Sequence, residues 1–371
     1  MAITKTIEPS GIYPVYNDSY LQFTSTLTNN FKAEIQLAPS ASFPNKFVVY
    51  PDADGLYTFN YREPARVVLG DYPFRDINGV AITTGTWGQS ITGSYVPLLS
   101  TIEVFSTSSS ETTSGNYTFY KSAKQIGEDV FVNTGQISNY STNGVDYDFT
   151  YFEGWQFSFE IQKLTTSDTV HIKNLNTGVT SSDMIPQYID SAFRIYVDKA
   201  VENWTSETFL PLTDNINRLE VYVNDVFKTN INLKKESSRC GVYLKWFNLD
   251  GGYSYHLFDE FFRLELNGSS DGDVNTNLFR NVGNLVGEST PIGISATQRY
   301  RLKTKVDVNE ANIIKSLFAS PMVQMYNSFD PYIDAQWLDV VVTSNYSINN
   351  KRSLNELVVN IETPQLTTAR I

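Results

Sequence analysis

The segment YLKWFNLDGGYSYHLF, residues 243–258, has the pattern of a β-hairpin. Six strand-forming residues precede Leu-Asp-Gly-Gly (249–252), and six more follow it. The Asp-Gly-Gly sequence supplies the positive φ angles that such a turn requires. Tyr253 and Tyr255 share one face of the second strand, and Trp246 lies on the facing strand. The segment therefore predicts two antiparallel strands joined by a tight turn.

The same period-two alternation extends outward from this hairpin along most of the chain. Its segments are short, rich in Tyr, Phe, Val, Ile and Thr, and bounded by Gly, Asn, Asp, Pro or Ser, which is typical of antiparallel sandwiches and barrels. The alternation places one set of side chains inward and directs Thr, Lys, Glu and Asn outward. The segments are YLQFTSTL (20–27), KAEIQLA (32–38), FVVYPD (47–52), LYTFNYR (56–62), WQFSFEIQKL (155–164), FRIYVDKA (193–200), RLEVYVN (218–224) and VFKTNINLK (226–234).

Two polar stretches interrupt the alternation. They are STSSSETTSG (106–115) and VNTGQISNYSTNGV (132–145). Runs of this composition predict long loops or a flap inserted between strands. In an assembly, we expect them to act as contact arms.

The last quarter of the chain predicts one prominent helix on an antiparallel sheet. Asp307 lies three residues before Glu310, which is a capping-box arrangement, and Pro321 ends the helix. An apolar face recurs at three- and four-residue spacing, formed by Val308, Ala311, Ile314, Leu317 and Phe318. We expect strands around this helix at 299–306, 322–327, 337–344 and 355–363, which gives an α+β unit.

A basic-polar segment, KKESSRCG (234–241), divides the chain. Residues 1–236 predict a β-sandwich region of one or two subdomains, with loops or an insertion at 100–150. Residues 237–371 predict the α+β domain. The fold class is therefore mainly β, with antiparallel β-sandwich structure followed by a C-terminal α+β unit.

The charge of the chain excludes several kinds of partner. Its 371 residues include 28 basic and 40 acidic side chains, for a net charge of −12. This field repels phosphate backbones and anionic lipids. No stretch approaches the about 18 apolar residues that a transmembrane helix needs. We therefore expect neither sequence-specific nucleic acid nor a membrane as a partner.

Groups suited to catalysis are sparse, and we expect no enzyme activity, no cofactor and no metal. The only cysteine, Cys240, is far in sequence from His171, although His256 could approach it across the hairpin. A buried, inert thiol is the commoner arrangement. Asp259 and Glu260 are adjacent, so on a strand they would point to opposite faces. The sequence alone does not exclude a pair of carboxylates that are distant in sequence.

One segment partly matches a calcium-binding loop. Asp271, Asp273 and Asn275 occupy the first, third and fifth positions of that pattern. The sixth position holds Thr276 where glycine is needed, and the twelfth holds Val282 where glutamate is needed. A polar turn is therefore the preferred interpretation, with an irregular cation site as the alternative.

The hairpin segment 240–258 resembles a motif of virion structural proteins of tailed bacteriophages that infect Bacteroidetes, the crAss-like phages among them. Those proteins carry a strand ending in Trp-Leu-Asn, a Gly-Gly turn, then aromatic-x-aromatic and Phe. In this chain Phe247 stands where Leu is common. The residues that carry this structural hairpin motif are Tyr243, Trp246, Asn248, Gly251, Gly252, Tyr253, Tyr255 and Phe258.

The resemblance extends to both ends of the chain but not to residues 65–150. Segments 14–18 (PVYND) and 31–35 (FKAEI) resemble the N-terminal strands of the same proteins. Residues 299–327, followed by WLDVVVTS (337–344), are similar to their last subdomain. This last region is also similar, more distantly, to the tail-tube-like folds of distal tail and tail-hub proteins.

The resemblance implies a non-enzymatic structural component of a virion, assembled in the host cytoplasm. The expected role is a ring-forming tail, neck or baseplate/hub protein. Its partners would be copies of itself and other phage tail, neck or baseplate proteins. The alternative is a receptor- or glycan-binding fibre or adhesin module, which would display exposed, coplanar aromatic side chains. We expect the hairpin aromatics to lie instead in a core or an interface.

Overall fold

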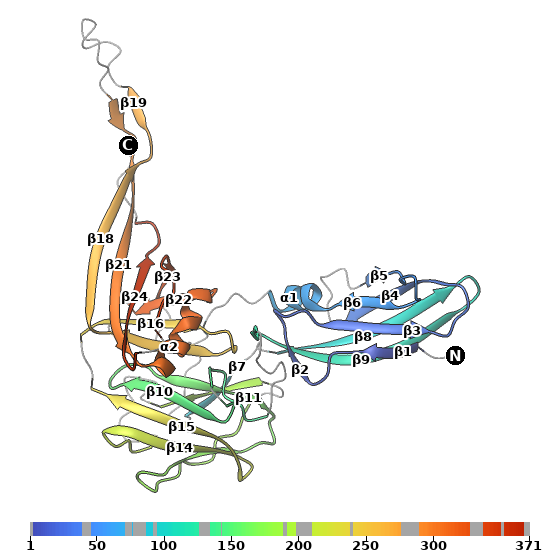
Figure 1. The fold of residues 1–371 in the computed structure, drawn as a ribbon, viewed down its shortest axis with the longest axis horizontal. Coiled ribbons are helices and arrows are strands. Elements are labelled where there is room, and N and C mark those ends of the chain that lie inside the picture. Colours follow the sequence, from blue (N-terminus) through green and yellow to red (C-terminus); the bar gives the residue numbers. More distant parts are fainter. Residues whose placement is uncertain are drawn as a thin grey trace, which may run out of the picture. The chain divides into compact units, whose positions relative to one another are not determined.

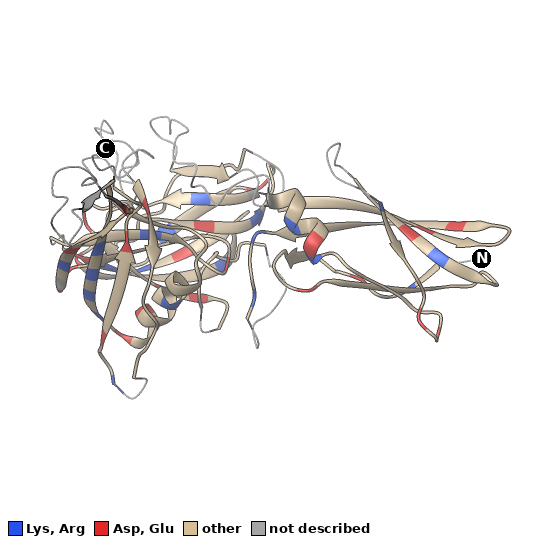
Figure 2. Cartoon of the chain, turned by 90° about the horizontal axis from the view of Figure 1, so that it is seen from above, with Lys and Arg blue, Asp and Glu red and all other residues tan. Residues whose placement is uncertain are grey.

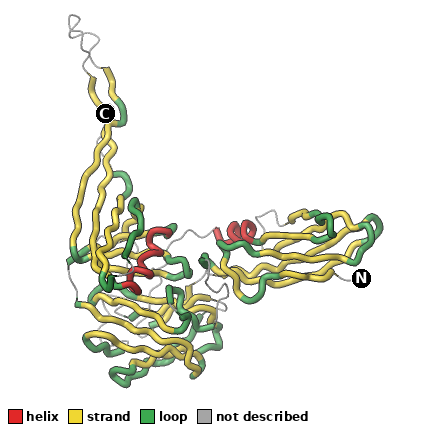
Figure 3. Tube along the Cα trace, in the orientation of Figure 1, coloured by secondary structure: helices red, strands yellow, loops and turns green. Residues whose placement is uncertain are grey.

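The computed structural model describes residues 3–38, 46–70, 76, 87–91, 95–125, 134–141, 143–187, 191–197, 210–237, 240–275, 289–326, 337–349 and 352–366. Within them the chain is mainly β, as the alternation predicts (Figures 1 and 3). It divides into two compact units, and each is described by itself. Unit 1 comprises Met1–Glu236 and Asn248–Tyr253, and unit 2 comprises Ser237–Phe247 and Ser254–Ile371.

The regular elements of unit 1 precede the turn 248–253 in the sequence. They are β1 (Ile3–Ile7), β2 (Ile12–Pro14), β3 (Tyr20–Ser25), β4 (Asn30–Ala38), β5 (Lys46–Val49), β6 (Tyr57–Asn60), α1 (Arg62–Gly70), β7 (Gly88–Ile91), β8 (Tyr95–Ser106), β9 (Ser110–Tyr120), β10 (Asp146–Phe152), β11 (Ser158–Leu164), β12 (Val170–Asn174), β13 (Ser191–Tyr196), β14 (Asn215–Val223) and β15 (Val226–Glu236).

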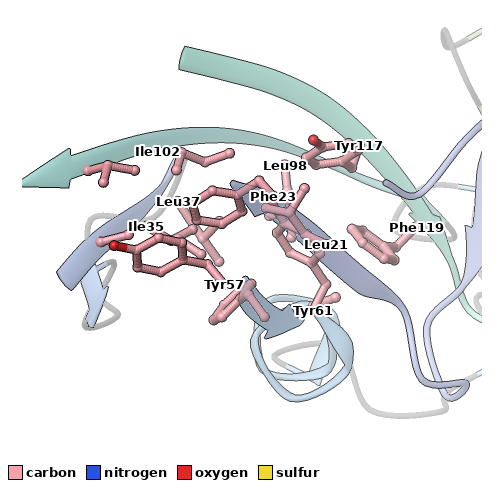
Figure 4. Packing of buried hydrophobic residues seen from close by; sticks show 14 of the residues in the cluster. Leu21, Phe23, Ile35, Leu37, Tyr57, Tyr61, Leu98, Ile102, Tyr117 and Phe119 are labelled. Atoms are coloured by element: carbon pink, nitrogen blue, oxygen red, sulfur yellow. The ribbon is translucent and has the colours of Figure 1, made fainter. Parts of the chain in front are cut away.

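Two sheets of unit 1 pack face to face around an aromatic core (Figure 4). Their strand orders are β1-β3-β6 and β2-β9-β8-β4-β5. Phe23 on β3 stacks on Tyr57 of β6 with ring centroids 5.0 Å apart. Helix α1 adds Ala65 and Leu69 to the same core. These sheets form the antiparallel sandwich that the sequence predicts.

Two further sheets of unit 1 have strand orders β10-β15-β14-β12 and β11-β13-β7. Phe149 on β10 stacks on Phe159 of β11, with ring centroids 6.2 Å apart. Most pairings are antiparallel. The exceptions are β10 with β15 and β2 with β9, which are parallel.

Unit 2 is built on a seven-stranded sheet with the order β17-β16-β22-β23-β24-β21-β18. Its elements are β16 (Val242–Phe247), β17 (Tyr253–Phe258), β18 (Phe261–Ser270), β19 (Asp273–Asn275), β20 (Ser289–Pro291), β21 (Ile294–Val306), α2 (Val308–Lys315), a 3-10 helix η1 (Ser316–Ala319), β22 (Val323–Tyr326), β23 (Trp337–Val342) and β24 (Asn355–Glu362).

Helix α2 is the prominent helix that the sequence predicts. The Asp307 side chain accepts a hydrogen bond from the Glu310 amide, and the Glu310 side chain accepts one from the Asp307 amide. This reciprocal capping box fixes the first turn. Ala311, Ile314 and Leu317 are buried, as the periodicity predicts, and α2 packs against β21 and β24.

Three sequence-based expectations are wrong in unit 1. Residues 106–115 are not a long loop, because Ser110–Tyr120 forms strand β9 and only a short turn separates it from β8. The strand expected over 56–62 ends at Asn60, where helix α1 begins two residues later. Glu160 on β11 does not point into solvent but is 1 % exposed. Within 132–145, residues 132, 133 and 142 lie outside the described part of the chain.

Candidate functional site

The turn of the predicted hairpin is a tightly packed site within unit 1. Gly251 has a φ of 86°, and a Cβ atom there would lie 2.5 Å from the Tyr120 ring. A Cβ atom on Gly252 would lie 2.6 Å from both Glu160 Oε2 and the Ser138 carbonyl oxygen. Gly251 is therefore required by its left-handed conformation, and both glycines by the close approach of their neighbours.

Hydrogen bonds fix this turn at both of its glycines. The Tyr120 hydroxyl donates to the Gly251 carbonyl oxygen at 2.7 Å. The Asn248 side chain accepts from the Gly252 amide at 3.0 Å and donates to the Ser138 carbonyl oxygen at 2.9 Å. Asn248 is 1 % exposed. The motif asparagine thus closes the turn and ties it to the rest of unit 1.

A buried ionic cluster lies directly against the turn. Arg194 on β13 donates from Nε to Glu160 Oε1 at 2.8 Å and from an NH group to Asp76 Oδ1 at 2.7 Å. All three side chains are 1 % exposed. The second Glu160 oxygen accepts a hydrogen bond from the Tyr253 amide at 3.0 Å. The Arg194 guanidinium also lies 4.8 Å from the centroid of the Tyr253 ring.

Burial dominates the electrostatics of this cluster. It raises the pKa of Glu160 above its ordinary value of 4.5, against the opposing effects of the Arg194 charge and the Tyr253 amide. The neighbouring Asp76 carboxylate acts in the same direction as burial and also raises the pKa of Glu160. A buried ion pair adds little net stability relative to apolar side chains of similar volume, but removing one of its partners is strongly destabilising. The arrangement orients and holds the turn.

The other motif residues lie in unit 2 and are also buried. Trp246 is completely buried, and its indole NH donates to the Ser316 hydroxyl at 2.9 Å. Tyr243 stacks on Tyr255 with ring centroids 6.1 Å apart. Phe258 is completely buried. These aromatic side chains form core, as expected, and do not present an exposed surface for a sugar ring.

The two histidines and the cysteine are separate features. His256 Nε2 lies 3.1 Å from the Thr304 hydroxyl, and its ring packs edge-on against Phe258. Cys240 is exposed rather than buried, which corrects the expectation of an inert buried thiol. His171 stacks on Tyr222 with centroids 5.0 Å apart. The part of the chain that the structure describes holds no group of three or more His, Cys, Asp or Glu side chains placed to bind a metal.

The candidate acidic residues have local partners. Glu260 binds Lys305 at 3.1 Å. Asp273 accepts a hydrogen bond from the Ser270 hydroxyl at 3.2 Å, and Asp271 accepts one from Ser295. Thr276 and Val282, which decide against the calcium-loop pattern in the sequence, lie outside the described residues.

Sequence reasoning found the turn but missed the ionic cluster beneath it. Glu160 and Arg194 are directly paired across β11 and β13. Each is flanked by large apolar residues, in SFEIQ (158–162) and AFRIY (192–196). Two opposite charges that each interrupt such an apolar strand are a signal for a buried cross-strand pair.

No protein family model matches the chain, and no curated protein does. Among the described residues, no helix is long and apolar enough to cross a bilayer. A solved protein of unknown function from Porphyromonas gingivalis W83 is 14 % identical, over 63 % of this chain and 99 % of that one, with a TM-score of 0.18.

Two further solved structures are similarly distant. A tetra-tandem repeat from the extending region of a large adhesion protein is 9 % identical, over 100 % of this chain and 90 % of that one, with a TM-score of 0.23. An endo-fucoidan hydrolase of glycoside hydrolase family 107 is 12 % identical, over 80 % of this chain and 41 % of that one, with a TM-score of 0.17. At these TM-scores the likenesses carry no argument about fold or function.

Proposed function

We propose that this chain is a non-enzymatic structural component of a bacteriophage virion. Its place would be a ring-forming tail, neck or baseplate/hub position. The observation that carries the proposal is the buried turn 248–253, because it lies in the motif that resembles virion structural proteins. Its glycines fit against side chains with no room for a Cβ atom, and its asparagine and amides are hydrogen-bonded internally.

A motif used in this way supports a structural role. Tyr253 and Asn248 bind groups of their own chain, which suits a scaffold that must keep one shape. Rigid subunits that contact their neighbours head to tail close into a ring when the rotation per subunit divides a full turn. Acidic and basic residues are interspersed on the strands (Figure 2). Charged residues of both signs suit the polar rim of such contacts.

The first test is the mass of the purified protein, measured by size-exclusion chromatography with light scattering. A closed ring of about six or twelve copies is the expected result. A stable trimer would favour the fibre or adhesin alternative instead. Binding to a glycan array would support that alternative, and hydrolysis of a polysaccharide would contradict a non-enzymatic role.

A substitution in the turn tests whether the motif is needed for assembly, when it is compared with a substitution at an exposed position. Asn248→Ala removes the hydrogen bonds that close the turn, so we expect it to lower both the stability of unit 1 and the yield of assembled rings. Asn116→Ala is the matched control, since Asn116 is exposed on β9 of unit 1, away from the turn. Equal ring formation by both variants would contradict the proposed role of the motif.

A further inference from the structure

Strand β18 ends the seven-stranded sheet of unit 2. One of its edges pairs with β21. The paired residues run from Phe261 opposite Lys303 to Ser270 opposite Ile294. Its other edge pairs with no strand in the part of the chain that the structure describes. An open edge of this length presents unpaired amide and carbonyl groups, which are a template for another strand.

This edge strand also carries an uncovered apolar stripe. Phe262, Leu264 and Leu266 are 53 %, 51 % and 66 % exposed. They alternate along β18, so they lie on one face of the sheet. Three large apolar side chains exposed together on a sheet edge mark an interaction site.

The stripe continues the face that helix α2 covers elsewhere in unit 2. Phe262 is directly paired with Leu302 on β21, and Leu302 with Val359 on β24. Directly paired residues lie on the same face of a sheet. Leu302 and Val359 are completely buried, and α2 packs against their two strands. The apolar face is thus covered over β21 and β24 and uncovered over β18.

The opposite face of the same strands is charged. Arg299 on β21 binds Glu362 on β24 at 2.9 Å. On β18 this face carries Arg263 and Glu265, whose side chains are 3.1 Å apart and 63 % and 36 % exposed. One side of the open strand is therefore apolar, and the other carries one charge of each sign.

The order of these residues makes β18 complementary to itself. In an antiparallel pair of two β18 strands centred on Leu264, Arg263 of each copy faces Glu265 of the other. In the same register, Phe262 faces Leu266, and the two Leu264 side chains meet on the two-fold axis. Both faces therefore match, with opposite charges on one and apolar side chains on the other.

We infer that β18 is the contact by which two copies of this chain pair, edge to edge and antiparallel, in the register centred on Leu264. The partner is a second copy because the charge pattern is complementary under a two-fold operation. The contact is isologous, so the same patch serves both subunits. It joins the two sheets into one and places the two apolar stripes side by side.

This inference goes beyond the proposed function and does not depend on it. An isologous contact acting alone gives a dimer. Combined with head-to-tail contacts, it gives two rings face to face. Loss of the β18 contact would then separate the two rings but leave each ring closed, so the two proposals can fail separately.

A charge-exchange series tests the register. Arg263→Glu places four acidic side chains around the two-fold axis, and Glu265→Arg places four basic ones. We expect each single variant to raise the dissociation constant of the β18 contact on the order of tenfold, measured by analytical ultracentrifugation. The double variant R263E/E265R restores opposite charges and should restore pairing. Because Arg263 is exposed and Glu265 is only partly buried, we expect the variants to keep the fold, which circular dichroism checks.

Mixing the two single variants gives a sharper result. In the mixed pair, the two acidic side chains of the Arg263→Glu copy face the two basic side chains of the Glu265→Arg copy. We expect a heterodimer that neither variant forms well with itself. If wild type, single variants and mixture all have the same dissociation constant, or if wild type shows no two-fold pairing, the inference is wrong.

A disulfide tests the position of the axis. In a Cys240→Ser background, Leu264→Cys places two cysteines directly opposite, with Cα atoms about 4.5–5.5 Å apart, which a disulfide spans. Leu266→Cys is the matched control, because its two copies would be about 13 Å apart along the strands. Mild oxidation should link only the Leu264→Cys variant. Equal linking at both positions, or none at Leu264→Cys, overturns the register.

Discussion

The two end strands of the seven-stranded sheet differ sharply although both are rich in aromatic and aliphatic residues. All residues of β17, YSYHLF, are buried. Among the described side chains of β18, from Phe262 to Ser270, none is buried. Apolar composition alone therefore does not tell which edge of a sheet belongs to a core. The turn before β17 is bound by the buried Glu160 through the Tyr253 amide, whereas β18 follows Glu260, which pairs with Lys305 at the surface, and carries a self-complementary pattern.

The largest expected effect is at the start of β17. Arg194→Leu removes the guanidinium that donates to both Glu160 and Asp76, two carboxylates that are 1 % exposed. We expect a loss of about 3–5 kcal/mol in the stability of unit 1. Hydrogen exchange of the β11 and β13 amides measures it. The control, Arg263→Leu on exposed β18, should cost less than about 1 kcal/mol, and equal losses would remove the contrast between the strands.

Alanine substitutions at two glycines compare the turn before β17 with the exposed strand β18 without changing any charge. Gly252→Ala, just before β17, would bring a Cβ atom within 2.6 Å of Ser138 and Glu160. We expect it to cost about 2–3 kcal/mol through overpacking. Gly268→Ala, on β18, meets only Ile294 at 3.4 Å and should change stability by about 0.5 kcal/mol or less. Thermal unfolding of the two variants compares them directly, and similar melting temperatures would contradict the packing of the turn.

A pH series isolates the cluster beside β17. Because burial raises the pKa of Glu160, the folded protein binds a proton more tightly there than the unfolded chain does. The contribution of this group to stability is therefore fully present below its ordinary pKa of 4.5 and is lost as the pH rises through the folded value. Glu160→Gln remains neutral throughout.

The stability of wild type relative to Glu160→Gln should therefore fall between acidic and neutral pH. Urea unfolding of both proteins across that range measures the difference. Asn116→Ala, an uncharged change at an exposed position of unit 1, provides the control, because its stability relative to wild type should not change with pH. If wild type instead became more stable relative to Glu160→Gln as the pH rises, the Arg194 charge rather than burial would dominate the pKa of Glu160.

The smallest effect concerns the helix that covers the face next to β18. Asp307→Ala removes one hydrogen bond of the capping box and should destabilise α2 by about 1 kcal/mol. Hydrogen exchange of the α2 amides would detect this loss. The amides of β17 should be unchanged, and a comparable loss there would show that the two ends of the sheet respond together.

Local chemistry predicted much of this fold. The alternation located most strands, the Asp-Gly-Gly sequence located the turn, and the Asp307–Glu310 pair located α2. Alternation failed at Glu160, because both faces of β11 are buried and its polar side chains meet polar partners. It also failed at α1, a short helix whose Val67 and Val68 favour strands.

The remaining features depend on contacts between distant parts of the sequence. Asp76 reaches Arg194 across 118 positions, and Tyr120 reaches Gly251 across 131. No local pattern encodes such distances. The polar run 106–115 does not by itself distinguish a loop from a strand, because Ser and Thr occur both in loops and on the exposed faces of strands. Only the pairing with β8 shows that its residues from Ser110 onward form a strand.

Residues 248–253 belong to unit 1 although they follow the first residues of unit 2 in the sequence, and this order has a consequence for folding during synthesis. The first 236 residues emerge from the ribosome without the segment that supplies the Tyr253 amide to Glu160. Unit 1 therefore cannot finish folding until synthesis has passed into the sequence of unit 2. For the same reason, a protein cut at residue 236 loses part of unit 1 rather than a neighbouring domain. Anyone dividing this chain for expression should keep residues 1–253 together.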